Sequence, residues 1–424
     1  MDADAGGLRR VALGTALIGA AAFVLIAINR VPWHPVPGGM PDPVAASSVF
    51  SPTQIDRAEH FANWGRVWSW SSLAVSLSVA CWLGFSRRGR ALAERVPGWW
   101  WVRIVLVVAA LTVIGRVVTL PFAIALQRLR LDEGLATSSW STWTADLVKG
   151  ELISIVMTSL ALVAVLGCAR VWPRLWPAIA GVGGAALVVA GSFVYPLVIE
   201  PVFNDFHSLP DGELRTDVLA LAKAEGVQVD DVLVADASRR TTTLNAYVSG
   251  IGATRRVVLY DNLVDGSPHD EALSVVAHEL GHARDGDVVT GTALGAAGAM
   301  VGVGLLALLL PTARRKGARD GHCATSSTAA GLGAGVVPRV LALAAIATLA
   351  SAPIQNAVSR QLETRADVTA LQTTKDPQAF AALQRRLALR SHADPTPPAW
   401  SQWWFGSHPT VLERIALARS GLGR

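Results

Sequence analysis

The chain has 424 residues, of which 51% are hydrophobic and only 16% are charged. Soluble globular domains carry nearer a quarter charged residues, so this composition excludes an ordinary soluble globule. The formal charge of +5 is small, and no basic run with interleaved aromatic residues is present, which argues against a nucleic-acid partner. The three cysteines, Cys81, Cys168 and Cys323, lie far apart and offer neither a disulfide framework nor a Cys-rich metal site.

Long apolar stretches alternate with short basic segments along the chain. A helix needs about 20 mostly apolar residues to cross a hydrocarbon layer of about 30 Å. Stretches that approximately meet this length are Val11–Ile28, Val67–Phe85, Ile104–Leu126, Leu152–Ala169, Ala178–Ile199, Val288–Leu310 and Val336–Ala352. We therefore predict a predominantly α, polytopic membrane protein with about seven transmembrane helices.

Two details of these spans need interpretation. The first stretch follows Arg9 and Arg10 as a secretory signal would, but it lacks a small-residue cleavage pattern, which favours a retained span. Two other spans contain an internal arginine, Arg116 and Arg339. We expect each arginine either to pair with a neighbouring helix or to line a hydrated cavity.

The long polar region between the fifth and sixth spans has mixed character. A helical pattern over Glu213–Glu225 is followed by strand-like runs at Val229–Ala235 and Arg256–Tyr260. A second polar region, 353–424, is helical around Gln355–Leu371. These patterns predict a small α+β domain attached to the membrane helices.

The motif that carries chemistry is His278-Glu279-Leu280-Gly281-His282, at the end of the first polar region. Residues i and i+4 of a helix share one face, so both imidazoles can reach one metal ion. Glu279 lies one step round the helix, where its carboxylate can deprotonate an attacking water. The alternative is a surface helix with two unrelated histidines, which is improbable because the chain has only nine histidines.

A catalytic zinc site needs a third protein ligand and one open position. Asn356, Arg360, Glu363 and Asp367 recur at spacings of 4, 3 and 4, so they follow one helical stripe just beyond the seventh span. A helical hairpin of spans six and seven brings this stripe to the membrane side of the motif. Glu363 is then the preferred ligand, and Asp367 is a neighbouring carboxylate for ligand orientation or proton transfer. A merely solvated helix face is the alternative.

Two further segments fit a protease. Asn245–Gly250 precedes an apolar strand and can form an exposed sheet edge, which binds an extended peptide by strand addition; an ordinary hairpin strand is the alternative. His408 lies in a loop before a C-terminal helix. On its own it is an ordinary surface residue, but beside a zinc site it becomes a candidate donor to a developing oxyanion.

Together, these motifs resemble the M48 metallopeptidases, specifically the type I CAAX prenyl protease (Ste24-like) branch. The matching segments are His278–His282, Ser359–Asp367, Asn245–Gly250, Ser407–Pro409 and Glu413–Ile415, with Gly134–Trp140, Asp146, Lys149–Gly150 and Tyr195–Asn204 in the membrane half. Seven spans, with the motif between the fifth and sixth, fit this branch better than the four-span HtpX-like branch.

The resemblance implies transmembrane helices that enclose a chamber, a small zincin-like α+β catalytic domain, and one Zn²⁺ per chain. It also implies a role for each site residue: His278, His282 and Glu363 as zinc ligands; Glu279, Asp367 and His408 as catalytic residues; Asn245, Ala246 and Tyr247 as substrate-binding residues; Arg360 and Asn356 as residues that support the ligands. We expect a membrane domain over 1–200 (spans one to five) and a peptidase domain over 201–424. Spans six and seven lie at about 288–352, and segment 353–424 completes the site.

The function implied is an integral-membrane zinc metalloendopeptidase of the EC 3.4.24 type, with a peptide or protein substrate, lipidated, membrane-embedded or unmodified, and the lipid bilayer as its partners. Eukaryotic members of the branch cut after a prenylated cysteine, whereas the Ala-, Gly- and Arg-rich composition suggests a bacterial source without prenylated substrates. The alternatives are a broad-specificity quality-control protease of membrane proteins (an HtpX-like role) and a non-catalytic zinc-containing transporter or binding protein. The intact Glu279 argues against the last of these.

The distribution of basic residues bears on orientation, because Lys and Arg in short loops tend to stay in the cytoplasm. The N-terminus and the segments after spans two, four and six contain thirteen Lys and Arg residues, whereas the segments after spans one and three contain six. This count places the catalytic region outside the cytoplasm. The eukaryotic relatives place it in the cytosol, so the two criteria give opposite orientations for this multi-pass cell-membrane protein.

Overall fold

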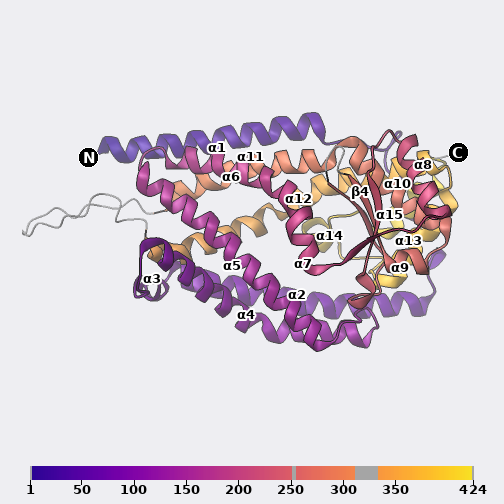
Figure 1. Cartoon of the computed structure of the whole chain (residues 1–424), viewed down its shortest axis with the longest axis horizontal. Helices are drawn as coiled ribbons and strands as arrows, with labels where there is room; N and C mark the ends of the chain where they lie inside the picture. The colour runs from indigo at the N-terminus through magenta and orange to yellow at the C-terminus, as the bar shows by residue number, and fades with distance from the viewer. Residues whose placement is uncertain (1, 251–254, 311–332, 423–424) are drawn as a thin grey trace, which may run out of the picture.

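The computed structural model describes residues 2–250, 255–310 and 333–422. Long helices run alongside one another through most of the molecule, with the N-terminus at the end of this bundle (Figure 1). A small sheet and several short helices form the other end, where the C-terminus lies. The predominantly α class and the added α+β domain are therefore confirmed.

The described residues contain seven helices that are long and apolar enough to cross a membrane, as the sequence predicted. They are α1 (Asp2–Arg30), α2 (Pro52–Phe85), α4 (Trp100–Asp132), α5 (Trp140–Val171), α6 (Trp176–Val194), α11 (Asp287–Leu309) and α12 (Val337–Thr374). The short helix α3 (Arg87–Glu94) joins α2 to α4, and α6 continues through a π-helical turn, Tyr195–Ile199, into α7 (Glu200–Phe203).

Both arginines inside the spans have partners on neighbouring helices. Arg116 of α4 pairs with Glu151 of α5, and its Nε lies 2.6 Å from the Glu151 carboxylate. The guanidinium of Arg339 on α12 lies 5.9 Å from the centre of the Phe85 ring on α2. A buried arginine is costly in a membrane unless it is paired, so these contacts explain how the spans accommodate the charges.

The seventh span and the polar stripe belong to one continuous helix. The sequence predicted a span over Val336–Ala352 and a helical pattern around Gln355–Leu371, and α12 joins them in one helix that runs unbroken from Val337 to Thr374. Pro353 lies inside this helix, and the helix continues through it. The membrane-spanning segment and the residues around Glu363 are therefore parts of one continuous helix.

The small domain is built on a four-stranded mixed sheet with the order β1-β2-β4-β3. Its strands are β1 (Phe206–Ser208), β2 (Asp231–Ala235), β3 (Ala246–Ser249) and β4 (Arg256–Tyr260). The central pair, β2 and β4, is parallel, whereas β1 and β3 pair antiparallel with their neighbours. The strand β3 is thus an edge strand, with one side free to pair.

The sheet carries its core on the side of two helices, α8 (Glu213–Ala224) and α10 (His269–Asp285). Val232, Val257 and Leu259 from the sheet pack in one cluster with Val276 and Leu280 from α10, and all five are almost fully buried. Burial of such side chains stabilises the domain by roughly 2 kcal/mol each. The helix that carries the His-Glu motif is therefore fixed to the sheet through its apolar face.

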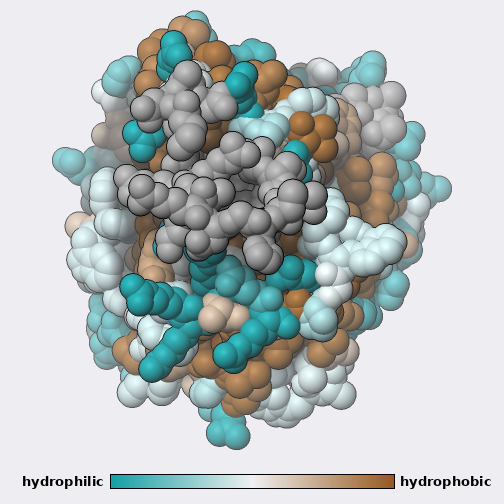
Figure 2. All heavy atoms as spheres, turned by 90° about the vertical axis from the view of Figure 1, so that its left-hand side faces the viewer, coloured by the Kyte–Doolittle hydropathy of each residue, from teal (hydrophilic) through white to brown (hydrophobic). Residues whose placement is uncertain are grey.

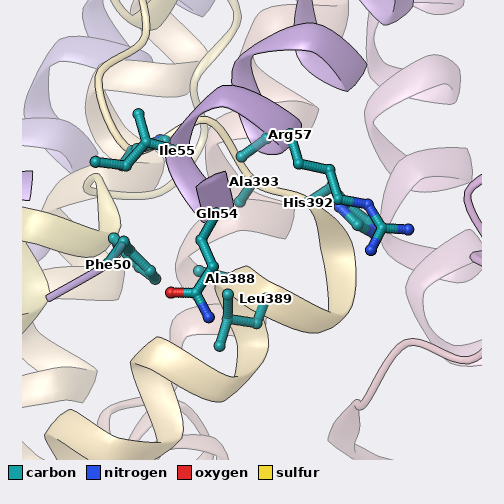
Figure 3. A pocket seen from close by; sticks show the side chains of 10 residues that line it. Phe50, Gln54, Ile55, Arg57, Ala388, Leu389, His392 and Ala393 are labelled. Carbon is teal, nitrogen blue, oxygen red and sulfur yellow. The ribbon is translucent and has the colours of Figure 1, made fainter. Parts of the chain in front are cut away.

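The remaining elements close the catalytic end. They are α9 (Asp261–Gly266), α13 (Pro377–Ser391), α14 (Ala399–Phe405) and α15 (Val411–Arg419). A cavity of about 250 Å³ separates the beginning of α2 from the end of α13, with Gln54 and Arg57 on one side and Leu389 and His392 on the other (Figure 3). Near this cavity, α13 is joined to the segment before α2, because Arg385 Nε donates to the Val49 carbonyl.

Glu225, at the C-terminal cap of α8, is a buried acid that does not line the cavity of the His-Glu motif. The residue is 8% exposed, and neither carboxylate oxygen has a hydrogen-bond partner among the described residues. Burial raises the pKa of Glu225 from 4.5 to about 7. The folded state therefore binds this proton more tightly than the unfolded state, and stability falls as the pH rises from about 4.5 to about 7.

We expect Glu225→Gln, which removes the charge and keeps the shape, to raise the melting temperature at pH 8 by about 2 °C. At pH 4.5, where wild-type Glu225 is protonated in the fold, the two proteins should melt together. Thermal melts of detergent-purified protein at both pH values measure this. Glu213→Gln, on the exposed first turn of the same helix, is the control, and an equal gain at both pH values would contradict the assignment.

Candidate metal centre and active site

The two histidines of the motif lie one turn apart on α10. Asp270 and Glu271 in the first turn suit the positive end of the helix dipole, and Gly286, with φ of +69°, ends the helix. The Nε2 atoms of His278 and His282 lie 3.1 Å apart. A side chain at Gly281 would bring a Cβ within 3.1 Å of Thr369 on α12, so the glycine between the histidines permits close contact of the two helices.

Glu363 reaches the histidine pair from α12. Its carboxylate lies 3.2 Å from His278 Nε2 and 3.6 Å from His282 Nε2. One ligand atom from each of the three residues lies within 4.8 Å of the others, as required for a common metal ion. Glu363 Oε2 is also buried without a hydrogen-bond partner in the described part of the chain, an arrangement that a cation would satisfy. Two imidazoles and a carboxylate are a typical donor set for catalytic zinc.

Each histidine has a carboxylate behind it. His278 Nδ1 lies 2.9 Å from Asp367, which also forms a salt bridge with Arg414 of α15. His282 Nδ1 lies 2.7 Å from Asp287, and Asp287 in turn pairs with Arg365 of α12. Such partners fix the tautomer and the orientation of metal-binding imidazoles, leaving Nε2 of each ring to face the ion.

The sequence reasoning missed Asp287, Arg365 and Arg414. Asp287 could have been found from its position, five residues after His282 and next to the glycine that ends α10. A metal-binding histidine generally donates its other ring N–H to a carboxylate, and Asp287 is close enough in sequence to accept it. Arg365 and Arg414 lie in the segments Ser359–Asp367 and Glu413–Ile415 that resemble the family, but the sequence assigned neither of them a role, because their partners Asp287 and Asp367 are distant in the chain. Asp367 was identified, and it lies behind His278, outside the cavity wall that the described residues form.

Glu279 faces a cavity of about 360 Å³ that also contains the ligand residues. The walls come from β3, α10, the beginning of α11, α12 and the loop before α15, with Val248, Val288 and Leu362 as the apolar part. Burial raises the pKa of Glu279, while the neighbouring His278 and His282 oppose that rise. A carboxylate with a raised pKa accepts a proton at neutral pH more readily than an ordinary one.

The structure brings His408 to the same cavity, with Nε2 3.4 Å from Glu363 and its side chain 57% exposed. The other two polar residues of the α12 stripe make no hydrogen bond or ion pair with the proposed ligands within the described residues. Instead, Asn356 Nδ2 donates to the Trp404 carbonyl, and Arg360 donates to the Gly406 carbonyl. These two residues therefore attach α14 and the His408 loop to the helix that carries Glu363.

The segment 245–247 lies at the edge of the sheet, although its side chains point in different directions. Asn245 is exposed and Ala246 is buried, while Tyr247 Oη donates to Glu200 at the end of the membrane helices, at 3.4 Å. The residues of β3 that line the cavity are Val248 and, just beyond the strand, Gly250. The free edge of β3 thus leads into the cavity.

The fold and this site define a membrane-embedded metallopeptidase with a His-Glu-x-x-His helix. Residues 208–421 match peptidase family M48. Residues 61–205 match the CAAX prenyl protease N-terminal domain, which has five membrane helices. The chain belongs to peptidase family M48. It is a membrane metalloprotease, and therefore a peptide hydrolase, with a Ste24-like fold. Membership of this family implies a metal site, and the cluster of His278, His282 and Glu363 could hold the ion.

Similar proteins come from bacteria and eukaryotes. An uncharacterized metalloprotease of Bacillus subtilis, YhfN, is 27% identical over 403 residues, or 93% of this chain and 92% of its own. The CAAX prenyl protease 1 homolog of Oryza sativa is 31% identical over 284 residues, covering 64% of this chain and 62% of its own. The crystal structure of Ste24p from S. mikatae has a TM-score of 0.76 at 18% identity, covering 97% of this chain and 98% of that one.

The buried Asp287 should control how strongly the site holds a metal ion. Because Asp287→Asn replaces the carboxylate that accepts from His282 Nδ1, we expect zinc affinity to fall by about 10- to 100-fold. Competition with a chromogenic chelator on the purified protein measures this affinity directly.

Asp285→Asn is the matched control. Asp285 lies two residues earlier and contacts Arg284 and Arg365, but it does not contact either histidine. Its zinc affinity should stay within about threefold of wild type. Equal losses in the two variants would show that the arginine network, rather than the Asp287–His282 contact, determines affinity.

Proposed function

We propose that this chain is a zinc metalloendopeptidase that uses one Zn²⁺ held by His278, His282 and Glu363. The observation that carries the proposal is Glu279, which faces the same cavity as the three candidate ligands. A structural zinc site would have four protein ligands and no use for a base beside them. The presence of Glu279 therefore argues against a non-catalytic transporter or binding protein.

When bound, zinc would polarise the scissile carbonyl and lower the pKa of the attacking water. Glu279 takes the proton from that water and later delivers it to the leaving amine, so it serves first as general base and then as general acid. His408 donates to the oxygen of the carbonyl as negative charge develops there. Asp367 holds His278 through Nδ1 and is a positioning residue, and Asn356 and Arg360 hold the loop of His408.

The substrate is an extended peptide segment that adds to the free edge of β3. Strand addition satisfies the backbone groups of Ala246 and leads the segment past Val248 towards Glu279, while Asn245, whose carbonyl already accepts from the Tyr260 amide at 3.0 Å, offers its exposed side chain. Tyr247, which faces Glu200, supports the strand from its other side. The substrate can be an unmodified, a membrane-embedded or a lipidated peptide, and a broad quality-control role remains the second candidate because the cavity wall beside the base is partly apolar.

We also propose that the membrane domain covers residues 1–200 and the peptidase domain covers 201–424. The two family descriptions meet between residues 205 and 208, which supports this division. The peptidase part includes two spans, α11 and α12, so it is itself anchored in the bilayer.

The catalytic proposal predicts different losses in two variants. Glu279→Gln should retain zinc and lose activity by at least about 100-fold, because only the base is removed. Glu363→Ala should lose zinc as well as activity, because a ligand is removed. Purified protein is incubated with a mixed library of unmodified, farnesylated and transmembrane peptides, products are identified by mass spectrometry, and zinc is measured separately.

Several outcomes of this experiment discriminate between the candidates. Products that require Glu279 and disappear with a chelator support the endopeptidase. One cleavage near a C-terminus indicates a processing enzyme, whereas many cleavages in unfolded membrane substrates indicate quality control. Full zinc occupancy in Glu363→Ala would refute the ligand assignment, and no product from any zinc-loaded sample would refute the peptidase itself.

We propose that the catalytic end faces away from the cytoplasm. Hydrophilic side chains gather on the end of the bundle remote from the sheet (Figure 2), where α3 exposes Arg87, Arg88 and Arg90. Short basic segments of this kind usually stay in the cytoplasm. The charge distribution supports the outward orientation, although eukaryotic relatives of the branch face the cytosol.

Cysteine labelling in intact cells tests the orientation. In a background with the three native cysteines replaced by serine, Asp211→Cys on the catalytic domain should react with an impermeant maleimide without lysis. Arg88→Cys, at the opposite end, should react only after lysis. Both positions are exposed, so the reverse pattern would place the catalytic end in the cytoplasm.

A further inference from the structure

The wall of the catalytic cavity contains one arginine, Arg255, among its described residues. Arg255 directly precedes β4, and its backbone is fixed because its carbonyl accepts from the Asp230 amide at 2.7 Å. The residue is half-buried and shares the cavity with the proposed base Glu279 and ligand Glu363. A cationic residue therefore lines the same cavity as the proposed base and ligands.

The side chain of Arg255 makes no hydrogen bond or ion pair with any residue that the structure describes. The other arginines around the site are all engaged: Arg365 with Asp287, Arg414 with Asp367, and Arg360 with the Gly406 carbonyl. The four residues that precede Arg255, Ile-Gly-Ala-Thr, contain no acidic side chain. Two of the three acidic residues of the cavity are committed, since Glu363 faces the histidines and Asp287 binds His282; the third, Glu279, makes no ion pair with Arg255 in the described part of the chain.

A guanidinium has five N–H donors arranged to match a carboxylate, and its charge is retained at every physiological pH. A half-buried guanidinium without a partner is poorly solvated and gains from a bidentate anion. We propose that Arg255 binds a carboxylate of the peptide substrate and thereby selects acidic substrates at one end of the binding edge. This inference rests on the peptidase function proposed above.

Which carboxylate of the peptide reaches Arg255 depends on the direction in which the peptide runs along β3. Ser249, the last residue of β3, is paired with Arg256, so Arg255 lies beyond the C-terminal end of the binding strand. A substrate antiparallel to β3 places its N-terminal part there, and the carboxylate is then an acidic side chain before the scissile bond. A parallel substrate places its C-terminal part there, and the free C-terminal carboxylate becomes the ligand.

The experiment uses one cleavable peptide in several forms and measures kcat/KM with the zinc-loaded, detergent-purified chain. One pair has Asp or Asn before the scissile bond, and the other pair has a free or an amidated C-terminus. We expect wild type to prefer the carboxylate form of one pair by about tenfold or more, as for a charge-assisted hydrogen bond. The pair that shows the preference identifies the source of the carboxylate.

Arg255→Gln should abolish that preference, Arg255→Lys should retain part of it, and Arg255→Glu should favour a peptide with Lys at the same place. Arg256→Gln, one residue further on and outside the cavity wall, is the matched control and should keep the wild-type preference. Zinc content is measured for every variant, so a loss of the metal site cannot imitate a loss of selectivity.

The outcomes separate the two proposals. If wild type cleaves the neutral and acidic forms equally, or if Arg255→Gln retains the preference, the role of Arg255 is refuted while the peptidase function stands. If zinc-loaded wild type cleaves none of these peptides or those of the mixed library, the peptidase function itself fails.

Discussion

The site depends on the contact between α10 and α12. The helix α10 supplies two of the three candidate ligands from the sheet side, and α12 supplies the third from the membrane side. Gly281 and Thr369 meet where the helices cross, at a distance that leaves little room for a larger side chain. Because α12 is continuous from its membrane half to Thr374, a shift of this helix in the bilayer also moves Glu363. The membrane-spanning half of α12 and the candidate metal centre are therefore expected to move together.

Charges buried around this contact explain why so many arginines surround it. Asp367 is 1% exposed and Asp287 is 7% exposed, and an unpaired carboxylate so buried would cost several kcal/mol. Arg414 and Arg365 offset that cost, and the acids are then available to hold the imidazoles. The pairing brings α15, far along the chain, to the ligand helix, so that 278–287, 363–367 and 408–414 form one polar cluster. Because the Nδ1 atom of each histidine has a carboxylate partner, each imidazole ring has one favoured orientation, and this rigidifies the site.

The sequence contained much of this arrangement, and the missing part has a physical explanation. The spans, the motif helix, the strand Arg256–Tyr260 and the grouping of His278, His282 and Glu363 follow from periodicity, spacing and resemblance, all of which are local signals. The sequence placed the end of the seventh span at Ala352 and the start of the polar region at Pro353, whereas α12 runs through this position without a break. Arg365, Arg414 and Arg255 were missed because a solvated arginine and one that serves a buried acid or a cavity have the same local pattern. Their roles are determined by residues distant in the sequence.

The two surfaces that a peptide must contact are held by different parts of the chain. The metal centre is anchored by α12, whereas the edge strand β3 is held from behind by Glu200, which accepts from Tyr247 and Ser249 at the end of the fifth span. The loop after α4 and the first turns of α5 add a second support, because the Thr137 amide donates to the Arg240 carbonyl in the segment before β3 and Asp146 of α5 pairs with Arg240. The core between the sheet and α10 sets the distance from the binding edge to the two histidines. The membrane helices add support behind β3 and supply Glu363 through α12, so the third candidate ligand depends on how the bundle packs against this core.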